Sequence, residues 1–275
     1  MTEVPAAWKL AEFVVDSNRS ELLSDGLWAL GVVAIEETSV SHGRTVLRTS
    51  IDESSAQSIA SLAGLHGAQL RWVTVPTAVV DTWREHAVPT AVSDGVWLVP
   101  AWLESPPGTG ILVEPFDTFG LGNHPTTVLA LRAAMHCARA GSLVLDMGSG
   151  SGVLAVALAA TSGATCECHD ISAAARSALE HNAGLNGVSS LVSWRGPLTE
   201  RDEGRYDMIV ANILAPVLRG IAAQLTAAAR RGGEIVLSGI RADQADDVTA
   251  AYVGCTVEAV EERDGWVAVT LRRDS

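Results

Sequence analysis

The chain has 275 residues, 48% hydrophobic and 19% charged, a composition typical of a globular protein with one large or two ordinary domains. Its 32 acidic and 19 basic residues give a net charge of −13. This charge disfavours non-specific binding to nucleic acid or to an anionic membrane and favours a basic protein partner. Codon usage alone would produce a similar excess of acidic residues. No stretch approaches the ~20 apolar residues of a membrane span, and no signal pattern precedes Leu10, so we expect a cytoplasmic protein.

Residues 1–75 carry the pattern of a β-α-β-β-α-β module. The predicted strands are Trp8–Val15, Val32–Glu37, Arg44–Ser50 and Gln69–Val75, and the predicted helices run from Ser17 or Asn18 to Leu30 and from Glu53 to Leu65. This order is typical of a ferredoxin-like α+β domain. Residues 76–103 read as a linker with a helix over Thr77–Pro89 and a strand over Val96–Trp102.

Residues 104–275 form the larger predicted domain, in which strands and helices alternate after residue 142. The predicted strands are Ile111–Val113, Leu143–Asp146, Thr165–Asp170, Leu191–Trp194, Tyr206–Ala211, Glu234–Ser238, Cys255–Glu262 and Trp266–Leu271. The predicted helices are Pro125–Ala140, Gly152–Ala160, Ser172–Asn186, Pro216–Arg230 and Ala242–Tyr252. Repeated βα units predict an α/β fold with a doubly wound, mostly parallel sheet, and the Asp264-Gly265 pair predicts a closing antiparallel hairpin.

The most informative motif joins the end of a strand at Asp146 to the start of a helix through Gly148, Gly150 and Gly152. Glycine permits a sharp turn and close approach of a ligand, and a helix start supplies N–H groups suited to an anion. A dinucleotide site would need G-x-G-x-x-G, but Val153 stands at the third glycine position. The G-x-G-x-G spacing after an acidic residue therefore favours S-adenosylmethionine over a dinucleotide, with a merely tight turn as the alternative.

Two polar residues follow later strands of the same predicted sheet. Asp170 ends the next strand, where a carboxylate can accept both hydroxyls of a ribose, although it could also cap the following helix. Asn212 follows the fourth strand, at the edge where parallel sheets bind ligands, although asparagine is also a common turn residue. Its amide cannot take up a proton, but it can accept hydrogen bonds from an amine.

Four segments together resemble the bacterial ribosomal protein L11 methyltransferase family. They are Phe119-Gly-Leu-Gly122-Asn-His124-Pro-Thr-Thr127, Asp146–Gly152, Ala211–Ala215 and Leu237-Ser-Gly239-Ile240, and the similarity extends from about Asp81 to Arg272. The resemblance implies a seven-stranded methyltransferase sheet that binds S-adenosylmethionine, preceded by a substrate-recognition domain. It implies that the cofactor is bound by Thr127, Asp146, Gly148, Gly150, Gly152, Asp170 and Asn212. Leu121 departs from the threonine usual in the family, which puts the substrate in question.

The resemblance also implies methyl transfer to lysine and N-terminal amines of a basic ribosomal protein, without a metal ion. Asn212 would orient the amine, and His124 is the nearby titratable group suited to catalysis. Phe116 and Phe119 are candidate aromatic walls. The alternatives are another protein lysine, a small molecule or nucleic acid on the same fold, or a paralogue that only binds. Ala215 stands where base and amide methyltransferases place an aromatic residue, which argues against a planar target.

The cysteines Cys166 and Cys168 have two interpretations. They could belong to a metal or redox site, but a zinc site needs about four ligands and no second pair is present. Both lie in an apolar run that reads as a buried strand. We therefore expect them to be core residues.

Overall fold

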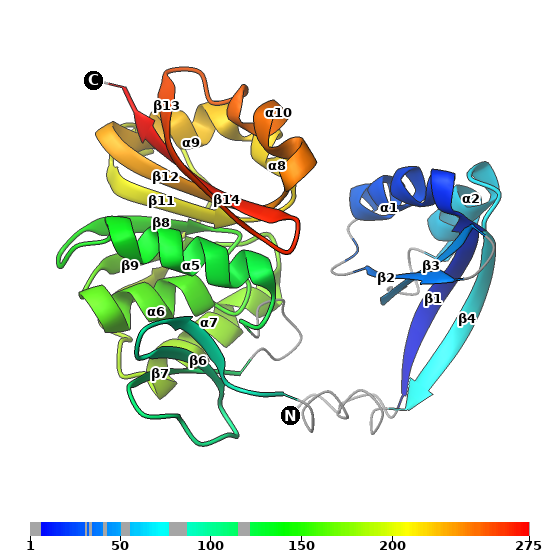
Figure 1. Cartoon of the computed structure of the whole chain (residues 1–275), viewed down its shortest axis with the longest axis horizontal. Coiled ribbons are helices and arrows are strands. Elements are labelled where there is room, and N and C mark those ends of the chain that lie inside the picture. The colour runs from blue at the N-terminus through cyan, green and yellow to red at the C-terminus, as the bar shows by residue number, and fades with distance from the viewer. Residues whose placement is uncertain are drawn as a thin grey trace. The chain divides into compact units, whose positions relative to one another are not determined.

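The computed structural model describes residues 7–30, 32, 35–40, 43–50, 56–76, 87–114 and 122–274 (Figure 1). The chain forms two compact units, Met1–Ala87 and Val88–Ser275. No helix within these described ranges is both long and apolar enough to cross a lipid bilayer.

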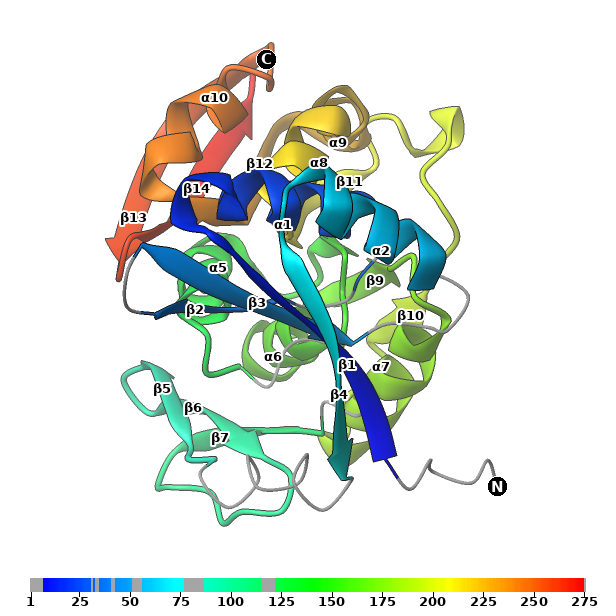
Figure 2. The ribbon, with the colours of Figure 1, turned by 90° about the vertical axis from the view of Figure 1, so that its right-hand side faces the viewer.

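The first unit is an antiparallel sheet with helices on it (Figure 2). Its elements are β1 (Ala7–Asp16), the 3-10 turn η1 (Ser17–Arg19), α1 (Ser20–Ala29), β2 (Glu36–Val40), β3 (Arg44–Ser50), α2 (Ala56–Leu65) and β4 (Gln69–Pro76). The strand order β2-β3-β1-β4 is that of the predicted ferredoxin-like arrangement.

The central strand β1 explains why this unit folds, because its alternate residues face opposite sides of the sheet. Ala11, Phe13 and Val15 are buried in a core that also contains residues of α1 and α2. On the other side, Glu12 forms ion pairs with Arg71 and Arg48, at 2.7 Å for Arg48. Their hydrogen bonds, Arg71's first, hold the pKa of Glu12 below its usual value.

Some sequence predictions for this unit need correction. The second strand spans Glu36–Val40 rather than Val32–Glu37, and the described apolar residues Val32 and Ile35 precede it. The second helix begins at Ala56 among the described residues, and the predicted start at Glu53 lies outside them. The predicted linker helix Thr77–Pro89 lies outside the described residues up to residue 86, and residues 87–89 are not helical.

The second unit is built on a large mixed sheet. In the order β10-β9-β8-β11-β12-β14-β13, its strands are Val192–Trp194, Thr165–His169, Leu143–Met147, Tyr206–Asn212, Ala229–Arg241, Trp266–Arg273 and Cys255–Arg263. The first five are parallel, and β14 lies antiparallel between β12 and β13. This confirms the predicted doubly wound, seven-stranded methyltransferase sheet with its closing hairpin. The hairpin turn has positive φ at Asp264 (55°) and Gly265 (78°), as a type I′ turn requires.

Helices cover both faces of this sheet (Figure 1). One face packs on α5 (Pro125–Cys137), α6 (Val153–Ser162) and α7 (Ala173–Leu185), and the other on α8 (Ala215–Gly220), α9 (Ala222–Ala228) and α10 (Ala245–Thr249). The short 3-10 turns η3 (Glu200–Asp202) and η4 (Ala242–Gln244) precede β11 and α10. Two covered faces explain the nearly continuous apolar runs of the parallel strands.

Two predicted helices differ from those observed. The single helix predicted over Pro216–Arg230 is interrupted at Ile221, whose φ of −107° and ψ of 7° leave the helical region. The chain has become strand by Ala229, which pairs with Tyr206. The helix predicted over Ala242–Tyr252 is also shorter, a 3-10 turn followed by α10. Apolar spacing continues through both breaks, so periodicity alone could not locate them.

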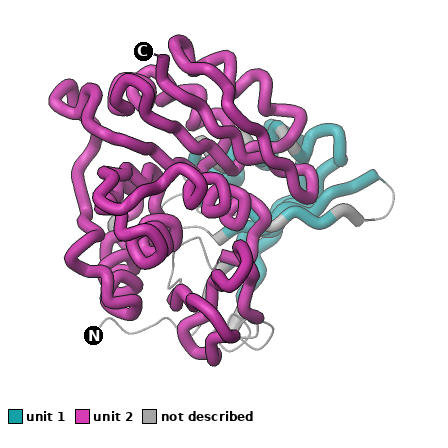
Figure 3. The backbone as a smooth tube through the Cα atoms, turned by 60° about the vertical axis from the view of Figure 1, so that its left-hand side comes forward, with its two compact units in different colours: residues 1–87 teal, residues 88–275 magenta. Residues whose placement is uncertain are grey.

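A separate small sheet precedes α5 and consists of β5 (Thr90–Ser93), β6 (Val96–Pro100) and β7 (Thr109–Val113). The sequence did not predict β5. Figure 3 shows the two units in different colours. Each unit has its own core, because the buried clusters of the second unit contain no residue before Val92.

Candidate functional site

The register of the large sheet brings three of the predicted site residues into one row. Met147 of β8 pairs with His169 of β9 and with Ala211 of β11. Gly148, Asp170 and Asn212 follow these paired residues, so all three lie at the carboxyl ends of their strands: Gly148 and Asp170 directly after β8 and β9, and Asn212 as the last residue of β11. This is the edge at which open parallel sheets bind ligands.

The glycine loop after β8 is held by its own backbone. All three glycines have positive φ, 75° at Gly148, 52° at Gly150 and 77° at Gly152. The N–H groups of Gly148 and Ser149 donate to the carbonyl of His169 at 2.8 and 3.1 Å, and Gly152 N donates to Ser149 O at 2.8 Å. These loop N–H groups are therefore already hydrogen-bonded within the protein. Among the N–H groups in the first turn of α6, the kind the sequence suggested for an anion, that of Ala155 donates to Asp146.

Packing explains why two of these positions are glycine. A Cβ on Gly152 would lie 2.2 Å from Cδ1 of Leu179, on α7. A Cβ on Gly148 would lie 2.3 Å from Cγ2 of Ile213, which follows β11. The loop therefore lies directly against α7 on one side and the residue after Asn212 on the other.

Asp146, at the end of β8, binds the start of the helix that follows this loop. It is fully buried, and its Oδ2 accepts a hydrogen bond at 3.1 Å from the N–H of Ala155, in the first turn of α6. Gly152, the N-cap residue, has no side chain to do this. The other oxygen, Oδ1, has no partner among the described residues. Burial first, and then the charge of Asp170, raise the pKa of Asp146 to about 7.

Asp170 connects the loop to the second helix. Its Oδ2 accepts from Gly150 N at 2.9 Å, and its Oδ1 accepts from Ser172 N at 2.8 Å. Each carboxylate oxygen can accept two hydrogen bonds, so one acceptor position remains on each beside these bonds. The next residue, Ile171, is 98% exposed. Sequence reasoning missed this isoleucine, although an apolar residue directly after a strand-end aspartate was a readable signal.

Asn212 contacts the first turn of α5, which lies far from it in the sequence. Its Nδ2 donates to Oγ1 of Thr127 at 3.3 Å, and Thr127 is 1% exposed. No other hydrogen bond of the Asn212 amide is found within the described part of the chain. The two motifs that carry them, H-x-T-T and N-I-L-A, are therefore brought together.

Ser238 and Gly239, on β12, contact the two segments that carry Thr127 and Asn212. The Ser238 hydroxyl is fully buried. Its proton can be donated to the carbonyl oxygen of Thr126, at 3.0 Å, or to that of Val267, at 3.2 Å. A Cβ on Gly239 would lie 2.5 Å from the carbonyl oxygen of Ile213. The sequence predicted these residues only as part of the family resemblance and did not indicate this structural role.

His124 is the N-cap residue of α5. Its Nδ1 accepts from Thr126 N at 3.3 Å and lies 2.8 Å from Thr126 Oγ1. Its ring contacts the edge of Trp266, with centroids 5.2 Å apart. Burial lowers the pKa of His124, which favours the neutral imidazole that this cap requires. Its predicted catalytic role stays a prediction.

The remaining candidates divide into two groups. Phe116, Phe119 and Leu121 lie outside the described residues. Cys166 and Cys168 are fully buried in β9 on the face covered by α6 and α7, which confirms the prediction that they are core residues. Burial raises the pKa of both thiols.

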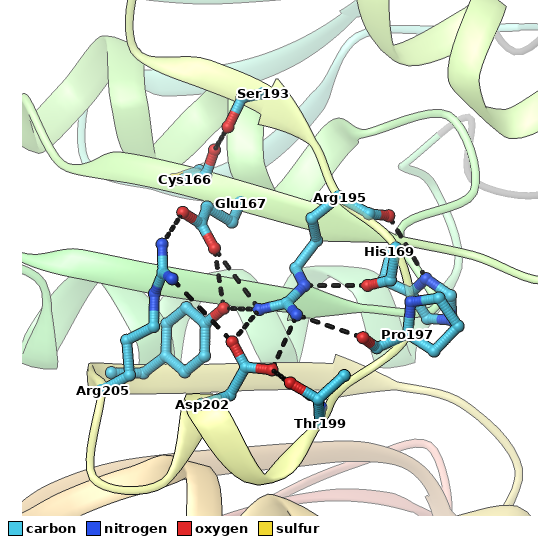
Figure 4. A network of polar contacts seen from close by, with 11 residues as sticks. Cys166, Glu167, His169, Ser193, Arg195, Pro197, Thr199, Asp202 and Arg205 are labelled. Atoms are coloured by element: carbon cyan, nitrogen blue, oxygen red, sulfur yellow. Dashed lines mark hydrogen bonds and ion pairs between the residues drawn. The ribbon is translucent and has the colours of Figure 1, made fainter.

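A polar network lies beside β9, which contributes Glu167, the residue between Cys166 and Cys168 (Figure 4). The guanidinium of Arg195 binds both carboxylate oxygens of Asp202 at 2.9 Å and also contacts the hydroxyl of Tyr206. Glu167 accepts from the Tyr206 hydroxyl at 2.7 Å and pairs with Arg205. Arg195 holds the pKa of Asp202 well below its usual range. The network ties the connection between β10 and β11 to the sheet, and it includes none of the predicted site residues.

Comparison with known proteins agrees with this geometry. The model of the family "Ribosomal protein L11 methyltransferase (PrmA)" matches residues 17–274. A ribosomal protein L11 methyltransferase of Thiobacillus denitrificans is 34% identical, with 94% of this chain and 97% of that protein covered. One of Pseudomonas syringae pv. tomato is 30% identical over 97% and 99% of the two chains. The match includes most of the first unit, where the sequence alone showed only the order of elements.

A solved structure gives the same result. The crystal structure of a ribosomal protein L11 methylase from Lactobacillus delbrueckii subsp. bulgaricus superposes with a TM-score of 0.62 at 28% identity. It covers 68% of this chain and 99% of the other. The chain therefore belongs to the ribosomal protein L11 methyltransferase family and is an S-adenosylmethionine-dependent protein methyltransferase.

Proposed function

We propose that this chain methylates lysine and N-terminal amines of ribosomal protein L11, with S-adenosylmethionine bound along the row Gly148, Asp170 and Asn212. The observation that carries the proposal is the register that aligns these three residues at the carboxyl ends of β8, β9 and β11. The substrate is taken from the names of the relatives.

The residues of this row fit the parts of the cofactor. The remaining acceptor positions of Asp170 suit the two hydroxyls of a ribose, because a carboxylate accepts in a bidentate manner. The exposed side chain of Ile171 offers an apolar surface to the adenine. The buried hydroxyl of Ser149, which has no partner among the described residues, is a candidate contact for the amino-acid end. Asp146 acts indirectly, because it holds the start of α6 while remaining fully buried.

S-adenosylmethionine supplies, when bound, a methyl group on a positively charged sulfur. Asn212 orients the incoming amine: its Nδ2 is fixed by Thr127, so its Oδ1 has a defined direction in which to accept an amine N–H. The amine must be neutral to react, and a free lysine has a pKa near ~10.4. Exclusion of water beside a positive charge lowers that pKa, so no strong base is needed from the protein.

The two units divide the work in this proposal. Residues 1–75 recognise the protein substrate, residues 76–103 link, and residues 104–275 bind the cofactor and hold the amine. The support is that all predicted site residues lie in the second unit, which has its own core. The net charge of −13 favours a basic protein and disfavours direct binding of nucleic acid. The reaction requires a cytoplasmic location, where ribosomal proteins are made.

Methylation of a planar base or amide is less well supported. The residue three positions after Asn212 is Ala215, which is 4% exposed as the first residue of α8. It therefore presents no aromatic surface on which a base could stack.

The test is methyl transfer to ribosomal protein L11 that lacks the modification. The purified chain and labelled S-adenosylmethionine should add methyl groups to lysine or N-terminal amines, located by mass spectrometry, and Asn212→Ala should be at least about a hundredfold slower. Label that enters RNA or small molecules instead, with none in the ribosomal protein, would refute the proposed substrate.

A further inference from the structure

Two asparagines, Asn182 in α7 and Asn186 at its C-cap, bind the main chain of β7 and of the residue after it through their side-chain amides, as a neighbouring strand would. Asn186 Oδ1 accepts from Leu112 N at 2.9 Å, and its Nδ2 donates to Leu112 O at 2.8 Å. Asn182 repeats the pattern on Glu114, with both distances at 2.9 Å. The spacing matches because four helical residues rise about 6 Å and two strand residues about 6.6 Å.

Only Asn182 also reaches the glycine loop. Its second Nδ2 proton is donated to the carbonyl of Ser151 at 2.8 Å, whereas the second Nδ2 proton of Asn186 returns to the carbonyl of Asn182 within the helix. Asn182 is 1% exposed, and these three bonds satisfy its donors and its acceptor inside the protein. The same helix packs Leu179 against Gly152.

We infer that Asn182 is a positioning residue for the cofactor, which couples the end of β7 to the glycine loop. Glu114 is the last described residue before the segment that leads to His124 and Thr127, and Ser151 belongs to the loop beside Asp170. One amide therefore holds the main chain of both. This inference rests on the proposed function, because it assumes that the cofactor lies against the loop.

Asn186 provides a matched control, since it has the same clamp on β7 and no contact with the loop. Both Asn182→Ala and Asn186→Ala should lower the melting temperature, because each removes a pair of part-buried hydrogen bonds to Glu114 or Leu112, and Asn182→Ala should lower it more because it also loses the buried bond to Ser151. Only Asn182→Ala should weaken binding of S-adenosylhomocysteine, by on the order of tenfold in calorimetry, the effect of one strong hydrogen bond. The KM for S-adenosylmethionine should rise with it more than kcat falls.

A charged variant supplies a readout that simple loosening would not change. In Asn182→Asp the new carboxyl keeps an acceptor for Glu114 N, but only its protonated form can donate to Ser151. Its binding deficit relative to wild type should therefore shrink as the pH falls from 8 to 6. A deficit that does not depend on pH, or equal weakening by Asn186→Ala, would overturn the inference.

Hydrogen exchange in the wild-type protein gives a test that needs no variant. Saturation with S-adenosylhomocysteine should slow exchange of the Glu114 amide by at least about threefold more than that of the Leu112 amide, since coupling between two sites is reciprocal. Equal slowing of the two amides, or none, would overturn the inference alone. Failure of the wild type to bind S-adenosylhomocysteine would overturn the proposed function, and this inference with it.

Discussion

The two halves of the candidate site are built in opposite ways. At the ends of β8 and β9, backbone N–H groups bond to the backbone carbonyls of His169 and Ser149 and to the carboxylates of Asp146 and Asp170. At the end of β11, side chains bond to one another, and the Asn212 amide meets a hydroxyl of a helix that starts 87 residues earlier in the chain. In the first half, a Cβ added at Gly148 or Gly152 would overlap a neighbouring side chain. The second half depends instead on the hydrogen bond between Asn212 and Thr127.

Ile213 joins the two halves. Its side chain occupies the space in front of Gly148, and its backbone lies against Gly239. The segment after β11 is thus held between the loop of one half and the strand of the other. A change in either half is expected to act on the distance between cofactor and amine.

The largest effect is expected for Gly152→Ala, in the half at the ends of β8 and β9, where a Cβ has no space. The added Cβ meets Leu179 while the backbone has a φ of 77°, so overpacking and backbone strain add. The free energy of unfolding should fall by about 3–5 kcal/mol, measured by urea denaturation.

Gly163→Ala is the matched control, since its φ is 72° but its Cβ would be 3.8 Å from the nearest atom. It should lose only about 1 kcal/mol, the cost of the backbone conformation. Similar losses in the two variants would show that the contact with Leu179 is unimportant.

In the polar half, Asn212→Asp should slow methyl transfer at neutral pH. A carboxylate stabilises the protonated amine, raises its pKa and so lowers the fraction that can react. Asn212→Ala should lose orientation and about 10²-fold in rate. Steady-state kinetics should show a lower kcat without a higher KM for the Asp variant, and its deficit should shrink as the pH rises toward 9.

Wild-type rates in either Asn212 variant, or a deficit independent of pH in the Asp variant, would remove Asn212 from the reaction. Thr127→Val is a useful companion, because it deletes only the hydroxyl that fixes the amide. It should give a smaller loss than Asn212→Ala.

The sequence was most informative where the site is local. Gly148 to Gly152 and Asp170 follow consecutive strands, so the alternation of elements alone placed them at one edge. The meeting of Thr127 with Asn212 spans distant segments, and only the family resemblance predicted that both serve one site. Asn182 was missed because a polar residue inside an amphipathic helix looks like a solvent-facing one. Asparagine is nevertheless unfavourable in helix interiors, so Asn182 was a readable signal, whereas Asn186 stands at the C-cap, where asparagine is common.

Outside the site, the sequence failed to predict a helix boundary and a polar network. The helix predicted over Pro216–Arg230 was wrong because apolar residues suit both helix and strand where the chain changes from one to the other at Ala229. The network around Arg195 was not found, because its partners come from a loop, a turn and two strands. Such contacts depend on tertiary structure and leave no periodic pattern.

Asp146 makes stability depend on pH in the first half. Its pKa is about 7 when folded and near 3.9 when unfolded, so its contribution is present below about pH 4 and is lost as the pH rises through 7. The side-chain amide of the variant Asp146→Asn keeps an acceptor for the N–H of Ala155 and cannot titrate.

The difference in free energy of unfolding between wild type and Asp146→Asn should change by on the order of 2 kcal/mol between pH 5 and 8, followed by urea denaturation at each pH. Parallel curves for the two proteins would show that Asp146 does not titrate in this range.

The smallest effect is expected at His124, the N-cap residue of α5, whose first turn belongs to the polar half. Asparagine is among the best N-cap residues, so His124→Asn should keep the cap and retain the wild-type rate at pH 8 within about threefold. Burial lowers the pKa of His124, so its contribution to stability is present above about pH 6.5 and is lost as the pH falls. This loss should be absent in the variant. A hundredfold slower reaction at pH 8 would instead support the catalytic role predicted from the sequence.

The central claim is that one cofactor lies along the row formed by Gly148, Asp170 and Asn212, and a crystal structure of the full chain with S-adenosylhomocysteine tests it most directly. The account predicts both ribose hydroxyls within hydrogen-bond distance of the Asp170 carboxylate, the adenine against Ile171, and the sulfur on the side of Asn212. A nucleoside bound elsewhere, or a ribose that does not contact Asp170, would contradict it.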